Sequence, residues 1–208
     1  VRLVGSEMCI RDSYGGAFVG VPVQTLAATV VKAVIEEAGI TGSDIDDIIL
    51  GQASPNGSAP ALGRIVALDA EIGIEVPGMQ LDRRCGSGLQ AVVTAAAHIA
   101  SGAAELIIAG GAESMSNTEF TVDGGIRWGV KGGTMELQDR LQEGREKAGG
   151  KHHPIPGGMI ETAENLREEY KISRERQDKM AEMSHARAAA AQENGDFADE
   201  IVPCLLYT

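Results

Sequence analysis

Aromatic side chains are scarce: they make up only 3% of the 208 residues. The chain therefore lacks the ring platform on which proteins stack unpaired bases. Basic residues are also in deficit, since 18 Lys and Arg stand against 30 Asp and Glu and leave a net charge of −12. Neutralising the phosphates of a nucleic acid needs a basic surface. These two shortages argue against a protein that binds nucleic acid.

Cysteine is rare as well, and long apolar runs are missing. Cys9, Cys85 and Cys204 form no C-x-x-C pair and no disulfide framework, so we expect a reducing compartment, the cytoplasm. No apolar run approaches the roughly 20 residues that cross a bilayer, so a membrane protein is not expected. Hydrophobic residues are 43% and charged residues 23% of the chain. This balance is typical of a globular protein with a sizeable core.

The two ends differ from the rest of the chain. Residues 1–13 show no helical or strand periodicity and no signal-peptide pattern. This leader and the tail at 204–208 resemble translated adapter sequence, and we expect both to be non-native; the alternative is an ordinary loose terminus. On this interpretation Cys9 and Cys204 carry no chemistry.

Helical and extended patterns alternate in the first half of the remaining sequence. Helices are expected at 22–39, 62–71 and 85–102. Short apolar strands are expected at 45–51, 79–81 and 106–109. The third helix has an apolar face formed by Leu89, Val92, Val93, Ala96 and Ile99. The alternation predicts an α/β fold whose parallel sheet is covered by helices on both faces.

The composition changes near Ser114. Residues 115–158 are polar and rich in glycine, and helical periodicity resumes at 162–170 and 173–194. A long loop in a compact domain is uncommon and usually functional. We therefore expect an N-terminal α/β domain at 14–114, an inserted loop-and-helix subdomain at 115–195, and a return towards the sheet at 196–203.

Cys85 is the residue with the clearest chemical meaning. The pattern places it after a short strand and at the start of a helix, where unpaired N–H groups and the helix dipole stabilise a thiolate. Gly86 and Gly88 let a substrate approach the backbone closely. The competing interpretation is a buried cysteine that acts as a small hydrophobic side chain.

Metal chemistry has little support in the sequence. His152 and His153 are adjacent, but no further ligands follow at a suitable spacing, so a solvated loop is expected and no metal site is predicted. No phosphate-binding G-x-x-x-x-G-K-[ST] loop occurs either.

Several segments resemble one enzyme family, in the family's order. The stretch LDRRCGSGLQA at 81–91 looks like a nucleophile motif, N-R-x-C-[SG]-S-G-x-Q-A. It is followed by AGGAESMSN, IRWGVKGG, GGMIETAENL, KISRERQD and FADEIVP. These motifs are similar to those of thiolases, the acetyl-CoA acetyltransferases and 3-ketoacyl-CoA thiolases. The likeness covers nearly all of 14–203.

The resemblance implies an acyltransferase of fatty acid metabolism. The Cys85 thiolate would take an acyl group from an acyl-CoA, in thiolysis of a 3-ketoacyl-CoA or in Claisen condensation of acetyl-CoA. Coenzyme A thioesters would be the substrates, with no further cofactor. The resemblance also implies a layered αβαβα fold built from two similar halves, of which this chain holds the N-terminal half with the loop subdomain. The intact enzyme would be a homodimer or a homotetramer.

Two departures from the family pattern matter. The family's catalytic Asn, its His and a second Cys in a C-x-G-G-G motif do not occur in this chain, so we expect the chain alone to be inactive. Many biosynthetic members have His-Met where this sequence has Gly158 and Met159. Met159 is expected to line the acyl or pantetheine pocket, with Gly158 beside it. The resemblance places Asp82–Arg84 near a dimer interface, in a structural pairing role.

Two other functions stay open. One is a condensing enzyme of the same superfamily, a 3-ketoacyl-ACP synthase, although the long loop insertion and MIETAEN at 159–165 count against it. The other is a thiolase-like lipid-binding protein without turnover.

Overall fold

The computed structural model describes residues 14–202. These residues form two compact units: 14–118 with 200–202, and Glu119–Asp199. The expected domain boundaries, after residues 114 and 195, lie a few residues before these divisions. The expected non-native segments 1–13 and 204–208, and Pro203, lie outside the described residues.

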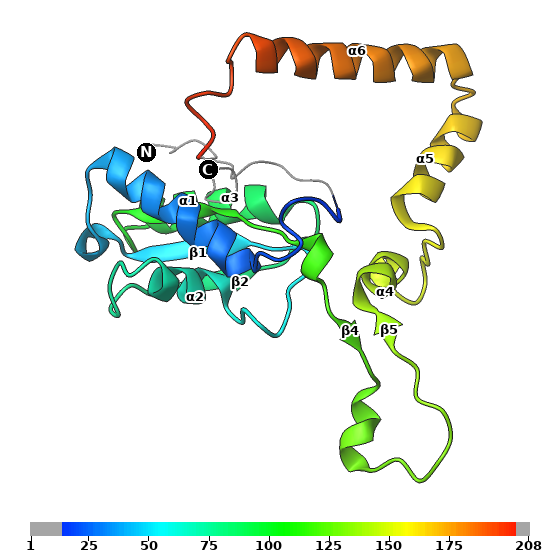
Figure 1. Cartoon of the computed structure of the whole chain (residues 1–208), viewed down its shortest axis with the longest axis horizontal. Coiled ribbons are helices and arrows are strands. Elements are labelled where there is room, and N and C mark those ends of the chain that lie inside the picture. The colour runs from blue at the N-terminus through cyan, green and yellow to red at the C-terminus, as the bar shows by residue number, and fades with distance from the viewer. Residues whose placement is uncertain (1–13, 203–208) are drawn as a thin grey trace. The chain divides into compact units, whose positions relative to one another are not determined.

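A parallel sheet organises the first unit (Figure 1). Within residues 14–118 it has three strands, β1 (Asp47–Gly51), β2 (Met79–Leu81) and β3 (Ile107–Gly111), in the order β2-β1-β3. Ile49 of the central strand pairs with Met79 on one side and with Ala109 on the other. The strands and their parallel arrangement confirm the expected α/β fold.

Helices cover both faces of this sheet, as expected. Helices α1 (Val23–Ala38) and α2 (Leu62–Asp69) pack on one face, against Ile48 and Leu50 of β1. Helix α3 (Ser87–Ala100) packs on the other face, where Ile49 meets Ala91 and Ala95. Successive residues of β1 thus point to opposite layers, as the alternation of a strand requires.

The ends of α1 follow from local chemistry. Pro22 has no N–H to leave unpaired, and its φ of −60° already suits the residue before a helix. At the other end Gly39 adopts φ +63°, the left-handed conformation that closes a helix and that glycine adopts without steric cost.

The expected apolar face of α3 is wrong in part. Leu89 is 72% exposed and Val93 is 52% exposed, whereas Ala91 and Ala95 are buried. The reason is the close approach of α3 to the sheet, which leaves room only for small side chains. The spacing of the large apolar residues therefore predicted the wrong face of α3: Leu89 and Val93 lie on the side away from β1.

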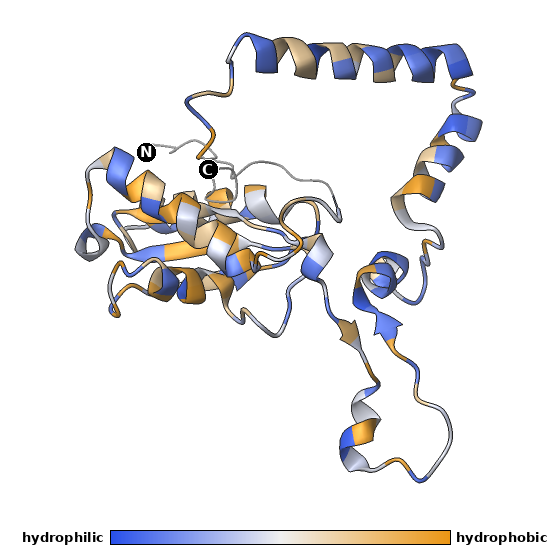
Figure 2. Cartoon of the chain, viewed as in Figure 1, coloured by the Kyte–Doolittle hydropathy of each residue, from blue (hydrophilic) through white to orange (hydrophobic). Residues whose placement is uncertain are grey.

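The second unit is mainly polar, and most of its residues are exposed. A short antiparallel pair, β4 (Phe120–Thr121) with β5 (Gln138–Asp139), precedes helix α4 (Arg140–Glu146). Helices α5 (Gly158–Glu169) and α6 (Arg174–Glu193) follow. Short 3-10 helices lie at Gly42–Asp44 and Met115–Asn117 in the first unit, and at Gly124–Trp128 and Lys147–Gly149 in the second. Figure 2 shows hydrophobic residues concentrated on the sheet and helices of the first unit, while α6 is mainly hydrophilic and has no buried residue.

Two negative findings hold for residues 14–202. No helix in that range is both long and apolar enough to cross a membrane. Nor do three His, Cys, Asp or Glu side chains gather there as possible metal ligands.

The beginnings of β1 and β3 are joined by Asp46. One carboxylate oxygen of Asp46 accepts the N–H of Glu105 at 2.6 Å and that of Leu106 at 3.0 Å, and the Asp46 N–H donates to the Leu106 carbonyl at 2.9 Å. The bonds from Leu106 and then Glu105 lower the pKa of Asp46 below its usual 3.8.

We predict that Asp46→Ala lowers the melting temperature at pH 7. Because the folded-state pKa of Asp46 is lowered, its contribution is present above pH 3.8 and is lost as the pH falls through the folded value. The difference between wild type and Asp46→Ala in the full-length gene product should therefore shrink below pH 3.8. Glu105→Ala removes a neighbouring charge and serves as the control. Equal melting temperatures for all three proteins at pH 7 would contradict the prediction.

Candidate active site

The carboxyl ends of β1, β2 and β3 lie at one edge of the sheet. The chain passes from β1 to β2 through α2 on one face and returns from β2 to β3 through α3 on the other. The switch point of this winding thus lies between β1 and β3, and crevices at such points are common ligand sites in α/β sheets. The residues that follow the strands here are Gln52, Asp82 and Ala112.

Cys85 lies in the loop between β2 and α3. It is exposed, and it is the free cysteine that the described part of the chain contains. The expectation that Cys85 opens the helix is wrong by two residues: α3 begins at Ser87, and Gly86 is its N-cap. The exposure of Cys85 argues against the alternative of a buried, hydrophobic cysteine.

The Ser87 side chain holds this loop in shape. Its hydroxyl accepts the N–H of Arg83 at 2.8 Å and donates to the carbonyl of Arg84 at 2.6 Å. Ser87 is only 3% exposed, so these bonds are shielded from water. Sequence reasoning missed this residue, although a serine that begins a helix and follows glycine was a usable signal.

Ser87 is in turn fixed by the end of β1. A Cβ atom on Gly51 would lie 2.4 Å from the carbonyl carbon of Ser87 and 2.7 Å from the Gly88 nitrogen. Any side chain at position 51 would push the first turn of α3 outward. The absence of a side chain at Gly51 therefore sets the place of α3, and with it that of Cys85.

A polar network joins the loops that follow the strands. Arg84 donates through Nη1 to the Ala53 carbonyl at 2.8 Å and lies 3.8 Å from the Asp82 carboxylate. Glu113 accepts the N–H of Ala53 at 2.7 Å and that of Ser54 at 3.3 Å. Asp82 and Arg84 thus pair within the chain.

The Glu113 carboxyl group is electrostatically unusual. Crowding by the surrounding loops removes water and raises the pKa of Glu113 above its usual 4.5, although part of the side chain stays exposed. The N–H bonds from Ala53 and Ser54 oppose that rise, and the nearby negative charge of Asp82 adds to it. The hydrogen bonds to Ala53 and Ser54 therefore hold the Glu113 carboxylate in a place where it is partly desolvated.

Gly158 and Met159 begin α5 in the second unit. Gly158 is buried and has φ +64°, a left-handed conformation that other residues adopt only with strain. This explains why a glycine suits the position better than histidine in this chain. Met159 is 71% exposed. Their role in an acyl pocket stays a prediction.

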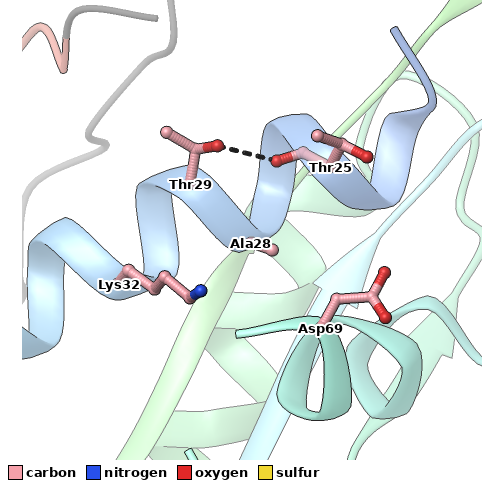
Figure 3. A pocket seen from close by; sticks show the side chains of 5 residues that line it. All are labelled: Thr25, Ala28, Thr29, Lys32 and Asp69. Atoms are coloured by element: carbon pink, nitrogen blue, oxygen red, sulfur yellow. Dashed lines mark hydrogen bonds between the residues drawn. The ribbon is translucent and has the colours of Figure 1, made fainter. Parts of the chain in front are cut away.

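A shallow hollow of about 320 Å³ lies between α1 and α2 (Figure 3). Its lining residues are Thr25, Ala28, Thr29, Lys32 and Asp69. The Thr29 hydroxyl donates back to the Thr25 carbonyl at 2.9 Å, and Lys32 pairs with Glu71 at 3.5 Å, so these polar groups already have partners. The hollow does not include Cys85.

The adjacent histidines of the sequence, His152 and His153, are exposed.

We predict that Gly51→Ala destabilises the full-length gene product by about 1–3 kcal/mol, the usual cost of overpacking. The added methyl group would overlap the backbone of Ser87 and Gly88. Gly110→Ala on the neighbouring strand is a matched control, because a Cβ there meets nothing within 4 Å. Urea unfolding of the three proteins makes the comparison. Equal losses of stability in both variants would refute the close-approach argument.

Comparison with known proteins gives a consistent result. A family described as "Thiolase, N-terminal domain" matches residues 1–208. The acetyl-CoA acetyltransferase of Chromobacterium violaceum is 39% identical over 207 residues, which are 99% of this chain and 51% of that protein. The acetyl-CoA acetyltransferase of Pseudomonas aeruginosa is 38% identical over 204 residues, 98% of this chain and 50% of that protein.

A solved structure agrees with these relatives. The crystal structure of the Bacillus anthracis acetyl-CoA acetyltransferase superimposes with a TM-score of 0.83 at 36% identity, over 92% of this chain and 47% of that one. The chain thus spans about half the length of the curated relatives it matches.

Proposed function

Because the chain belongs to the thiolase family, we propose that Cys85 is the nucleophile of an acyl-CoA:acetyl-CoA C-acyltransferase. The observation that carries the proposal is an exposed thiol in the loop between β2 and α3, at the carboxyl end of a parallel sheet. An exposed cysteine in a loop just before a helix can be reached by a thioester.

The first step is transfer of the acyl group to the enzyme. The Cys85 thiolate attacks the carbonyl carbon of an acyl-CoA, and the carbonyl oxygen becomes an oxyanion that backbone N–H groups can stabilise. Collapse of this intermediate breaks the bond to the CoA sulfur. The products are an acyl-Cys85 thioester and a CoA thiolate, which takes up a proton.

The second step depends on direction. In condensation, a base removes a proton from acetyl-CoA, and the resulting carbanion attacks the acyl-Cys85 carbonyl and releases the Cys85 thiolate. In degradation the sequence runs backwards: Cys85 attacks a 3-ketoacyl-CoA, acetyl-CoA leaves, and free CoA collects the shortened acyl group. Both directions need an acid and a base. The resemblance to thiolases assigns these roles to an Asn, a His and a second Cys whose motifs this chain does not contain.

Further features belong to the same proposal. Met159, with Gly158 beside it, lines the pocket for the acyl chain or the pantetheine arm, and CoA thioesters are substrates without another cofactor. The enzyme is a cytoplasmic homodimer or homotetramer of fatty acid metabolism. The scarcity of cysteine and the absence of a disulfide pattern in the sequence support the reducing compartment.

We predict that Cys85→Ala in the full-length gene product lowers kcat for thiolysis of acetoacetyl-CoA by about 10³-fold or more, the scale seen when a nucleophile is removed. Ser101→Ala, in the turn that follows α3, leaves kcat within a factor of about two, since surface changes away from a site have small effects. Full turnover by Cys85→Ala would refute the proposal. Transfer from a carrier-protein thioester in preference to CoA would favour the synthase alternative, and no transfer from either donor would favour the lipid-binding protein.

The 208-residue chain by itself should show no thiolysis. The chain does not contain the motifs of the proton-transfer groups that the resemblance implies, so we expect transfer of the acyl group to the second substrate to fail. Steady-state assays of the purified chain and of the full-length gene product test this directly. Comparable turnover by the two proteins would show that those groups are dispensable.

A further inference from the structure

The peptide group between Ala53 and Ser54, called the Ala53 peptide below, is held from both sides by residues far away in sequence. Its carbonyl, that of Ala53, accepts a hydrogen bond from Arg84 Nη1 at 2.8 Å, and its N–H, that of Ser54, donates to Glu113 Oε1 at 3.3 Å. The other carboxylate oxygen of Glu113 accepts the preceding N–H, that of Ala53, at 2.7 Å. Ala53, Arg84 and Glu113 follow β1, β2 and β3 respectively. One peptide group thus connects the loops at the carboxyl ends of all these strands.

Arg84 directly precedes Cys85 and has a costly backbone conformation. Its φ is +51°, in the left-handed region that residues with a Cβ rarely adopt. Three contacts hold it there: its N–H donates to Asp82 Oδ1 at 2.8 Å, its carbonyl accepts from the Ser87 hydroxyl, and its side chain reaches Ala53. Such conformations persist only where surrounding contacts determine them, and they gather at functional sites.

The charges support the same arrangement. Glu113 stays beside the Ala53 N–H even though burial and the Asp82 charge raise its pKa. The positive Arg84 lies between the Ala53 carbonyl and the Asp82 carboxylate. A cation on one side of the peptide and an anion on the other polarise that peptide in the direction that strengthens both hydrogen bonds.

We propose that Arg84 and Glu113 are positioning residues for Cys85: they clamp the Ala53 peptide between them and so fix the loop that presents the thiol. The inference rests on the proposed function for its catalytic consequence. Position 84 is the variable position of the nucleophile motif, N-R-x-C, so the resemblance to thiolases does not call for an arginine there. The clamp is a property of this chain's own residues.

The first test uses single substitutions in the full-length gene product. Arg84→Met removes the donor, and we expect kcat to fall about tenfold, within the range that a small misplacement of a reacting group costs. KM for the acyl-CoA stays unchanged if the Arg84 side chain acts through the Ala53 peptide alone, and a rise in KM would show direct contact with substrate and overturn the positioning role. Arg84→Lys keeps a donor and recovers part of the loss. Arg174→Met, which breaks an exposed pair with Asp178 on α6, is the matched control.

Arg84→Gly separates the clamp from the backbone strain. Glycine adopts φ +51° freely, so this variant keeps the loop conformation accessible while it removes the guanidinium. We expect the same loss of kcat as in Arg84→Met. Lys171→Gly is its control, since Lys171 has φ +50° in the second unit. Wild-type kcat in Arg84→Gly would overturn the inference.

The decisive test is a double-mutant cycle with Glu113→Gln. If both side chains act through the Ala53 peptide, the double variant Arg84→Met/Glu113→Gln loses little more kcat than the worse single variant. Losses that multiply would show two independent effects and overturn the inference.

The same variants are alkylated with iodoacetamide at pH 7, and the rate at Cys85 is read from the labelled peptide. We expect the rate at Cys85 to fall in Arg84→Met and to recover in Arg84→Lys, while Arg174→Met matches wild type. This readout needs no acyl transfer. If the wild-type enzyme transfers no acyl group, the proposed function fails while alkylation still tests the clamp. An unchanged alkylation rate in every variant, with normal wild-type turnover, overturns the clamp alone.

Discussion

The contact between the end of β1 and the first turn of α3 is the constraint on which the site depends. Gly51 and Ser87 approach so closely that no side chain fits at position 51. This contact fixes the Ser87 hydroxyl, and the hydroxyl holds the backbone of Arg83 and Arg84. Cys85 follows within the same loop. The location of the thiol is thus a consequence of backbone packing rather than of any contact made by the sulfur itself.

Local patterns in the sequence were sufficient to predict the helices and strands of the first unit. Pro22 and Gly39 bound α1, and the short apolar runs became the strands of the sheet. They failed at α3, where Leu89 and Val93 face away from the sheet. Periodicity detects large apolar side chains, but a helix that approaches glycines needs small ones, and Ala91 and Ala95 fill that role.

The candidate site was predictable only in part. Cys85 stood out because its neighbours match a nucleophile motif. The Ala53 clamp did not, because its hydrogen bonds join residues 31 and 59 positions apart. Only the return of the chain through α2 and α3 brings these loops together. Contacts of this kind depend on topology. The sequence around Cys85 therefore suggested a pairing role for Asp82 and Arg84 but gave no sign that Arg84 bonds to Ala53.

The proposed mechanism depends above all on an acyl group carried by Cys85, and trapping that acyl group is the most direct test. The full-length gene product is mixed with isotopically labelled acetyl-CoA, quenched in acid within the first turnover, digested and analysed by peptide mass spectrometry. We predict labelled acetyl on the peptide that contains Cys85, and its loss when CoA is added before the quench. Label on another residue, or an unlabelled Cys85 while products accumulate, would contradict it.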